Sequence, residues 1–242
     1  MPISRSMVTN RTVRYANEMK IANMQQSTNA LVNNLTDRQK DVLDAALQLL
    51  VKDHLALTMS KVAKAASCSK ETLYKWFGDR NTFLEAMVEW QASKVRAVPI
   101  SREAVDEQTL FNSLEHFARD WLMVLTSPTS IALNRLAVSQ AGTDKNNLGN
   151  IVLYRGPYAM ARRLKPILEI GRDCGLLQVD NLDNAFRTFF GLVVRDVQIR
   201  KLLGDDFHMD DEEIIREART ATRQFFALFG HKNMNKTDET QI

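Results

Sequence analysis

The sequence predicts an all-α fold, on three observations. Its 242 residues are 45% hydrophobic, which is enough to bury a sizeable core in one large domain or two modest ones. It contains only nine Gly and five Pro. Its apolar residues recur at the three- and four-residue spacing of helices, with few of the alternations typical of strands. We therefore expect four segments, residues 1–34, 35–98, 99–231 and 232–242, of which the second and third are helical.

Residues 1–34 are rich in Asn, Gln, Ser and Thr, for which a flexible arm is the favoured interpretation. The charged side chains of this arm are Arg5, Arg11, Arg14 and Lys20, opposed by Glu18. A basic arm can enter a minor groove or follow the phosphates of a nucleic acid. A tail without function and a short helix near residues 13–19 are the alternatives. Residues 232–242 are expected to form a second polar tail.

The first firm helix is expected from Thr36 to about Lys52. Thr36 and Gln39 show the pattern of a capping box, in which each side chain satisfies a free backbone amide of the first turn. The apolar stripe of this helix comprises Val42, Ala45, Ala46, Leu49 and Leu50. We expect this stripe to cover the two short helices that follow.

Two short helices are predicted over residues 59–66 and 70–77, joined by a tight turn. Thr58 and Ser69 are suited to cap them, because a side-chain oxygen just before a helix accepts from its first free amides. The packing side of the second helix carries Leu73, Trp76 and Phe77, and its polar side carries Lys70, Thr72, Tyr74 and Lys75. This is the layout of a helix-turn-helix that enters the major groove of DNA. An ordinary helical hairpin with a solvated basic face is the alternative.

Eight side chains of this segment are candidates for contact with double-stranded DNA. Cations and a phenol suit phosphate oxygens, and small hydroxyls can also reach base edges. The residues assigned mainly to phosphates are Lys70, Tyr74, Lys75 and Arg80. Ser69 and Thr72 are candidates for base edges or nearby phosphates, whereas Thr58 and Ser60 would anchor the first short helix to the DNA backbone.

A helix from residue 80 to about residue 97 is expected to connect this unit to the rest of the chain, with Pro99 ending it. Further helices are predicted over residues 106–126, 129–140, 148–155, 157–174, 181–203 and 211–229. Pro166 should kink the helix that contains it or mark a boundary. The last two helices carry broad apolar stripes, which indicate an interface between two copies of the chain. Completion of a monomer core is the alternative.

A small-molecule pocket is the second candidate site. The aromatic or flexible apolar side chains on helices that should converge are Phe117, Trp121, Met160, Phe186 and Phe189. Their chemistry suggests an apolar or aromatic ligand. An ordinary hydrophobic core explains the same residues and stays the alternative for each of them.

The sequence contains no motif for a cofactor, a metal or catalysis. It has no Gly-rich phosphate loop and no nucleophile elbow. Its four His and two Cys lack metal-ligand spacing, and two distant cysteines suit a reducing cytoplasm. No apolar run is long enough for a signal peptide or a membrane span. We therefore expect a cytoplasmic protein that is not an enzyme and that binds no cofactor, metal or membrane.

The segment from Thr58 to Leu84 resembles the DNA-binding segment of TetR-family transcription regulators. The residues that carry the resemblance are Val62, Ala63, Ala65, Ala66, Ser69, Lys70, Thr72, Leu73, Tyr74, Phe77, Gly78, Asp79, Arg80, Phe83 and Leu84. Three positions depart from the family pattern. Ser67 replaces the turn glycine, Cys68 replaces an apolar residue, and Arg80 replaces a lysine. A serine at a turn position with positive φ would be strained.

The region 110–204 is similar, more loosely, to the ligand-binding domain of an AefR-like subset of that family. The residues that carry this likeness are Ser127, Pro128, Arg135, Leu136, Gly171, Gly175, Asp180, Asp183 and residues 189–192. The resemblance implies a homodimer that reads a palindromic operator, and a repressor that is released when a small-molecule effector binds. A ligand-independent activator or architectural regulator of the same fold is the alternative.

Overall fold

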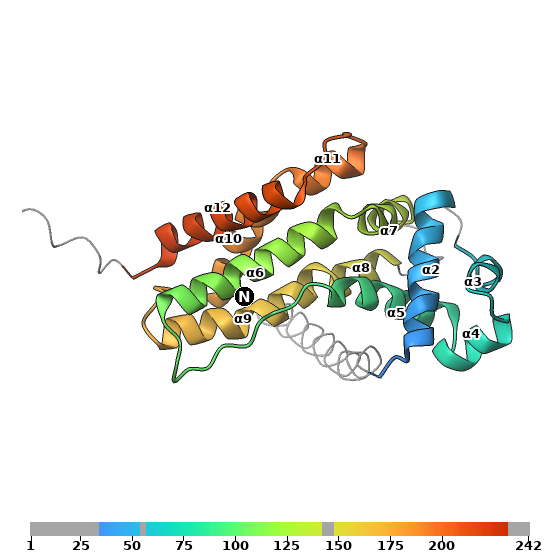
Figure 1. Ribbon diagram of the computed structural model, residues 1–242, viewed down its shortest axis with the longest axis horizontal. Coiled ribbons are helices and arrows are strands. Elements are labelled where there is room, and N and C mark those ends of the chain that lie inside the picture. The colour runs from blue at the N-terminus through green and yellow to red at the C-terminus, as the bar shows by residue number, and fades with distance from the viewer. Residues whose placement is uncertain (1–33, 54–56, 142–147, 232–242) are drawn as a thin grey trace, which may run out of the picture.

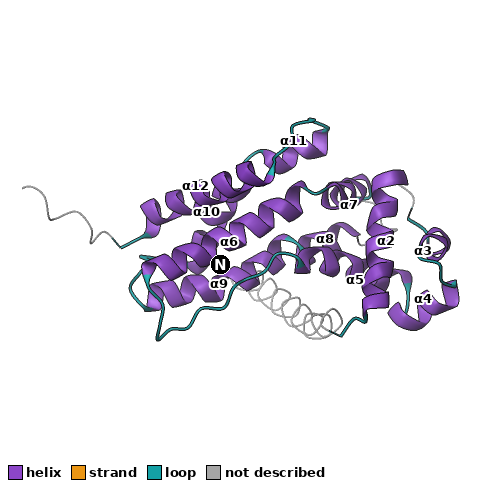
Figure 2. Cartoon of the chain, in the orientation of Figure 1, coloured by secondary structure: helices purple, strands orange, loops and turns teal. Residues whose placement is uncertain are grey.

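The computed structural model describes residues 34–53, 57–141 and 148–231 (Figure 1). These residues form α-helices joined by loops, and no β-strand occurs among them (Figure 2). The all-α fold predicted from the sequence is therefore confirmed. The expected N-terminal arm, apart from Asn34, and the expected C-terminal tail lie outside the described residues.

Three helices form one end of an elongated molecule, which we call the head (Figure 1). They are α2 (Asp37–Asp53), α3 (Met59–Ala65) and α4 (Lys70–Phe77), and α5 (Arg80–Ser93) follows them. The capping box predicted for α2 is present, since Thr36 N donates to Gln39 Oε1 (2.9 Å) and Gln39 N donates to Thr36 Oγ1 (3.3 Å). Because these side chains satisfy its first amides, α2 begins next to Thr36.

The remaining helices form a bundle that extends away from the head, which we call the body. They are α6 (Glu107–Thr126), α7 (Pro128–Ser139), α8 (Leu148–Arg155), α9 (Pro157–Asp173), α10 (Leu182–Val194), α11 (Val197–Leu203) and α12 (Asp211–Phe229). The last helix, α12, packs along α6 and α10. Two helices of the body contact the N-terminal helices: α7 packs against α2, and α8 packs against α5.

The described residues form two hydrophobic cores, and α5 contributes to both of them. The head core contains Leu73 of α4 and also takes in Leu136 of α7. The body core contains Phe117 of α6. From α5, Phe83 lies in the head core and Ala92 lies in the body core. A displacement of α5 would therefore disturb the packing of both units.

The helix expected to reach residue 97 is shorter than the sequence predicts, because α5 ends at Ser93. Arg163 of α9 donates from Nη1 to the carbonyl oxygens of Ala92 (2.5 Å) and Val95 (3.2 Å). These carbonyls lie where α5 turns into the following loop, and a distant guanidinium satisfies them. The local sequence does not reveal this contact.

The single helix expected over residues 181–203 is instead two helices, α10 and α11. They separate at Arg195, whose φ is +43° and therefore left-handed. Arg195 Nη1 pairs with Glu217 Oε2 of α12 at 2.8 Å. Val194 precedes Arg195 and Val197 follows it two residues later, and the low helix propensity of these β-branched residues makes a break at this point less costly.

The α9 helix continues through Pro166, where the sequence predicts a kink or a boundary. No helix ends or begins at this residue. Pro166 lies on the exposed surface, where water can replace the missing amide donor. Gly175 follows the end of α9 with a φ of +73°, a conformation common for a glycine just beyond a helix.

Candidate nucleic-acid interface and ligand pocket

The two short helices of the head begin at the predicted caps. Thr58 Oγ1 accepts from the Lys61 amide (3.3 Å), and Ser69 Oγ accepts from the Thr72 amide (3.1 Å). The hydroxyls of Ser69 and Thr72 also lie 3.1 Å apart, so one of them donates to the other. The Thr58 hydroxyl can still donate its proton to an outside acceptor, whereas the Ser69 hydroxyl is also hydrogen-bonded to the Glu71 carboxylate.

The turn between α3 and α4 is strained at Ser67 and held by α2. Ser67 has a φ of +49°, a left-handed conformation that costs a residue with a Cβ about 1 kcal/mol or more. Arg38 of α2 donates from Nη2 to the carbonyl oxygens of Ala66 (2.5 Å) and Ser67 (3.3 Å). Ser67, which stands where the family has a turn glycine, therefore does have the positive φ that strains a serine. Arg38 helps to fix the angle between the two helices.

The α4 helix buries one side and exposes the other. Leu73 and Phe77 are buried, and Phe77 meets Phe83 of α5 in an edge-to-face contact with ring centroids 5.2 Å apart. Tyr74 keeps 47% of its surface exposed. Gly78, with a φ of +79°, ends the helix. The polar side of α4 therefore faces outward on a helix whose packed side determines its position.

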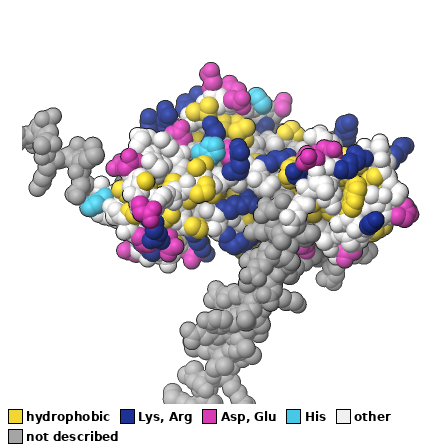
Figure 3. Space-filling view, turned by 60° about the horizontal axis from the view of Figure 1, so that its bottom comes forward, with side chains coloured by type: hydrophobic (Ala, Val, Ile, Leu, Met, Phe, Trp, Pro, Cys, Tyr) yellow, Lys and Arg dark blue, Asp and Glu magenta, His cyan; other side chains and the backbone are white. Residues whose placement is uncertain are grey.

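The predicted DNA contacts lie on consecutive elements of the head, from the start of α3 to the start of α5. The exposed ones are Thr58, Ser60, Ser69, Lys70, Tyr74 and Lys75. Thr72 and Arg80 are half-buried. Lys and Arg side chains are visible at the head end of the molecule in the space-filling view (Figure 3). This surface can offer hydroxyl, phenol, ammonium and guanidinium donors to an anionic partner.

The α2 helix is joined to α5 through Asp44. Trp90 Nε1 donates to Asp44 Oδ1 (2.9 Å), and Lys94 Nζ lies 3.4 Å from the same oxygen. Lys94 Nζ also donates to the side-chain oxygen of Gln91 (3.1 Å), a buried residue of α5. A series of hydrogen bonds therefore runs from the first helix of the head to an amide inside the molecule.

A cluster of two acids and two arginines joins α5 to the body, and two of its members, Glu89 and Arg155, are buried. Glu89 of α5, only 3% exposed, lies 3.0 Å from Arg163 of α9 and 3.9 Å from Arg155 of α8. Arg155 also pairs with Glu85 at 3.2 Å. Burial lowers the pKa of the Arg163 guanidinium, and the charge of Glu89 opposes that shift. The four charges cancel, so the cluster holds α5 against α8 and α9 without leaving a net buried charge.

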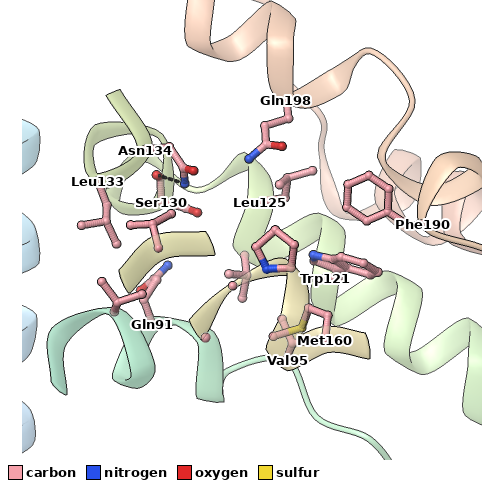
Figure 4. A pocket seen from close by; sticks show the side chains of 16 residues that line it. Gln91, Val95, Trp121, Leu125, Ser130, Leu133, Asn134, Met160, Phe190 and Gln198 are labelled. Atoms are coloured by element: carbon pink, nitrogen blue, oxygen red, sulfur yellow. Dashed lines mark hydrogen bonds between the residues drawn. The ribbon is translucent and has the colours of Figure 1, made fainter. Parts of the chain in front are cut away.

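A cavity lies between the end of α5 and the body (Figure 4). It contains about 570 Å³ of empty space, a figure that includes space open to solvent. The lining residues are Val88, Gln91, Ala92, Val95, Trp121, Val124, Leu125, Ser130, Leu133, Asn134, Val152, Gly156, Pro157, Met160, Phe190 and Gln198. A side chain at Gly156 would clash, because its Cβ would lie 2.7 Å from the carbonyl oxygen of Val152.

Two of the five predicted pocket residues, Trp121 and Met160, line this cavity. Phe117 and Phe189 are fully buried and are not among the lining residues. Phe186 does not line the cavity either, but its ring stacks on Trp121 with centroids 6.1 Å apart. These three phenylalanines belong to the body core.

The sequence patterns miss several polar residues that the structure places at the two sites. At the cavity they are Gln91, Asn134 and Gln198, and at the turn Arg38. Glu89 and Gln91 could have been noticed because they are polar residues at buried positions of α5, where the other buried residues are apolar. Nothing in the local sequence distinguishes Gln198 or Arg38 from ordinary surface residues.

Neither a metal site nor a membrane span is found in the described parts of the chain. There, no group of three or more His, Cys, Asp or Glu side chains could hold a metal ion. None of the helices in these parts is both long and apolar enough to cross a bilayer.

Two family models match the sequence. Residues 42–87 match the model for bacterial regulatory proteins of the tetR family. Residues 112–231 match the model for the C-terminal domain of AefR-like transcriptional repressors. The first match extends from α2 into α5, and the second covers nearly all of the body.

Known proteins are similar to this chain over most of their own length. A TetR transcriptional regulator from Agrobacterium tumefaciens has a crystal structure that is 44% identical, with a TM-score of 0.70 over 82% of this chain and 97% of that one. The structure of the flavonoid-responsive regulator FrrA is 25% identical, with a TM-score of 0.59 over 81% and 98% of the two chains. The uncharacterized HTH-type transcriptional regulator YvkB of Bacillus subtilis (strain 168) is 25% identical over 75% of this chain and 93% of its own length.

Proposed function

Because the chain belongs to the TetR family of DNA-binding transcriptional regulators, we propose that it is a repressor that a small apolar or aromatic ligand releases from DNA. It binds a palindromic operator in the cytoplasm as a homodimer. The observation that carries the proposal is the outward polar side of α4, held in position by the contacts of α4 with α5 and of Arg38 with the turn.

In this proposal α4 lies in the major groove and α3 crosses the DNA backbone. Lys70, Tyr74 and Lys75 contact phosphates from the exposed side of α4, and Arg80 does so from the start of α5. Ser69 and Thr72 contact base edges or nearby phosphates through their hydroxyls. Thr58 and Ser60 anchor α3.

Large apolar side chains exposed on the last helices support the homodimer. On α12, Ile215 is 43% exposed and Leu228 is 62% exposed. Ile199 and Leu203 of α11 are also exposed. Exposed apolar surface of this kind often marks an interface. A twofold axis through the body would give two α4 helices, which reach successive major grooves when they lie about 34–36 Å apart.

The cavity supports a ligand that controls DNA binding. Its lining is mostly apolar, and Trp121 and Phe190 contribute aromatic rings. The relative FrrA is described as flavonoid-responsive, and flavonoids are aromatic. Since α5 lines the cavity and also packs in the head core, a ligand that favours one position of α5 changes the position of α4.

Selection of DNA by the purified protein tests the DNA-binding part of this proposal. The protein is incubated with genomic fragments of its own organism, and the bound fragments are sequenced. We expect a few fragments that share an inverted repeat, whose half-sites lie about one or two helical turns apart. A bound pool with the same sequences as the input would contradict specific operator binding.

Lys70→Ala and Tyr74→Ala should each weaken operator binding about tenfold, because each removes a contact to DNA while the packed side of α4 stays intact. Lys70→Ala should also reduce the slope of log affinity against log salt by about 0.9. The measurement is fluorescence anisotropy of the selected operator at several salt concentrations. Lys165→Ala on α9 is the matched control. Parental binding by both head variants would refute the assignment of α4.

A reporter gene under the selected operator separates repression from activation. Deletion of the regulator gene should raise expression of the reporter. A fall in expression would instead identify an activator of the same fold. A repressor whose operator affinity no compound from an apolar and aromatic library changes would be ligand-independent.

A further inference from the structure

We propose that the cavity selects neutral, flat aromatic compounds that carry hydroxyl or carbonyl groups, and that it excludes carboxylates and other anions. This inference rests on the proposed ligand response and specifies the class of ligand. Three properties of the lining carry it: a rigid aromatic side, polar atoms without partners, and the absence of charged side chains from the residues that line it.

The aromatic side of the cavity is formed by Trp121 and Phe190, and Met160 also lines the cavity (Figure 4). The centroids of the two rings lie 5.3 Å apart. Trp121 also packs against Phe117 at 5.6 Å and Phe186 at 6.1 Å, so its ring is held on more than one side. A rigid aromatic wall favours a flat aromatic ligand, because ring contacts add to the stabilisation from buried apolar area.

Several polar atoms of the lining have no partner among the described residues. Asn134 donates from Nδ2 to the carbonyl oxygen of Ser130 (2.8 Å), which leaves its Oδ1 available to accept. Gln198 reaches from α11 into the cavity and makes no hydrogen bond to the described residues (Figure 4). The indole N–H of Trp121 likewise has no acceptor among them.

These unpartnered atoms include both donors and acceptors. An amide such as Gln198 can donate and accept, Asn134 Oδ1 accepts, and the Trp121 indole donates. Hydroxyl and carbonyl groups match this combination, and they would satisfy atoms that otherwise lose hydrogen bonds when a ligand displaces water. A purely apolar ligand would leave them unsatisfied.

Charge is missing from the lining. None of the 16 lining residues in the described chain is charged. Two arginines near the cavity, the buried Arg155 and the half-buried Arg163, are paired with Glu85 and Glu89. Lys94 is the cation bonded to Gln91, and it also lies beside Asp44. An anion in the cavity would therefore lose its hydration without gaining a free cation, which costs far more than burial of a neutral hydroxyl that finds an amide.

Three compounds of nearly the same shape test this class: naphthalene, 2-naphthol and 2-naphthoate. At pH 7 the first two are neutral and the third is an anion. Binding to the full-length protein is measured by isothermal titration calorimetry. We expect 2-naphthol to bind about five- to tenfold more tightly than naphthalene, the effect of one neutral hydrogen bond. 2-Naphthoate should bind at least about tenfold more weakly than 2-naphthol.

Substitutions at the two amides test which residues recognise the hydroxyl. Asn134→Leu and Gln198→Leu should reduce the advantage of 2-naphthol over naphthalene to about twofold or less, because each removes a polar partner without adding charge. Gln108→Leu, on the exposed first turn of α6 and outside the cavity, should leave the ratio unchanged. Asn134→Lys should reverse the order and favour 2-naphthoate, since it supplies the missing cation. Melting curves show that each variant is folded.

Equal affinity of the parent protein for 2-naphthol and 2-naphthoate would overturn the inference, and so would the absence of binding by all three compounds. An unchanged ratio in both leucine variants would overturn the role of the amides. No DNA is present in these titrations. A protein that selects operator fragments but binds no naphthalene compound contradicts this inference alone. A protein that binds the three compounds in the expected order but selects no DNA contradicts the proposed function alone.

Discussion

The head and the body of this molecule place their candidate contacts in different ways. In the head, the residues proposed to touch DNA come from one continuous segment, 58–80, whose own caps and apolar side orient its helices, and Arg38 of α2 holds the turn between them. In the body, the cavity is lined by residues from every helix between α5 and α11. The sugar-phosphate backbone of DNA has the same chemistry along its length, so residues from one short segment can supply the contacts to it. A pocket instead depends on how separate helices pack.

Alanine substitutions at two neighbouring aromatic residues would sharpen the description of the body. Phe117 is fully buried, so Phe117→Ala should lower the free energy of unfolding by about 3–5 kcal/mol. Trp121→Ala should cost less, because part of the Trp121 surface already faces the cavity. Denaturant unfolding of both variants measures the difference. A Trp121 variant that is destabilised as much as the Phe117 variant would show that this part of the body is a sealed core.

The junction between the two units can be broken at Glu89. Glu89→Gln leaves the buried Arg155 and the half-buried Arg163 with one acid less, so we expect a loss of about 3 kcal/mol in the free energy of unfolding. Glu213→Gln removes the partner of Arg216 from a surface pair on α12 and should cost less than about 1 kcal/mol. Chemical denaturation compares the two variants. Equal effects would mean that the cluster does not hold α5 to the body.

The strained turn offers a change that should stabilise the head. Ser67→Gly removes the cost of a Cβ at a φ of +49°, so the free energy of unfolding should rise by up to about 1 kcal/mol. Ser60→Gly, at an exposed position within α3, should lower it by about 0.5–1 kcal/mol. Thermal melts of the two variants give opposite shifts under this account. A lower melting temperature for Ser67→Gly would show that the turn is not strained there.

The smallest expected effect concerns the cap between α4 and α5. Bonds from the backbone amide and the hydroxyl of Thr82 lower the pKa of the Asp79 carboxyl below its ordinary value of 3.8. Its contribution to stability is therefore present above about pH 4 and is lost as the pH falls through the lowered pKa. Asp79→Ser keeps a capping oxygen that does not titrate. Melts at pH 5 and pH 3 should show a smaller loss for the variant than for the parent.

Most helices could be predicted from the sequence, because caps and apolar stripes are local. Thr58, Ser69 and Asp210 mark the starts of their helices, and Gly175 lies just beyond one. The wrong boundaries lie where distant residues intervene. The carbonyls at the end of α5 bond to Arg163 of α9, and α10 ends at a left-handed Arg195 that pairs with α12. Side chains more than twenty residues away leave no trace in the local pattern.

The two candidate sites differ in the same way. For the head, residue chemistry and spacing indicate which side of α4 is polar, and Leu73 and Tyr74 lie on the expected sides. For the body, aromatic residues that face a cavity cannot be told from those that fill a core, as Trp121 and Phe117 show. The amides of Asn134 and Gln198 become meaningful only when packing brings α7 and α11 to the same cavity.

The most direct test of this account is whether a ligand in the body and DNA at the head change each other's binding. The affinity of the parent protein for the selected operator is measured with and without a saturating neutral aromatic compound that calorimetry shows to bind. We expect the compound to weaken DNA binding by at least about fivefold, and saturating operator to weaken binding of the compound by the same factor. A bound compound that leaves the operator affinity unchanged would contradict the proposed coupling of the body to the head through α5.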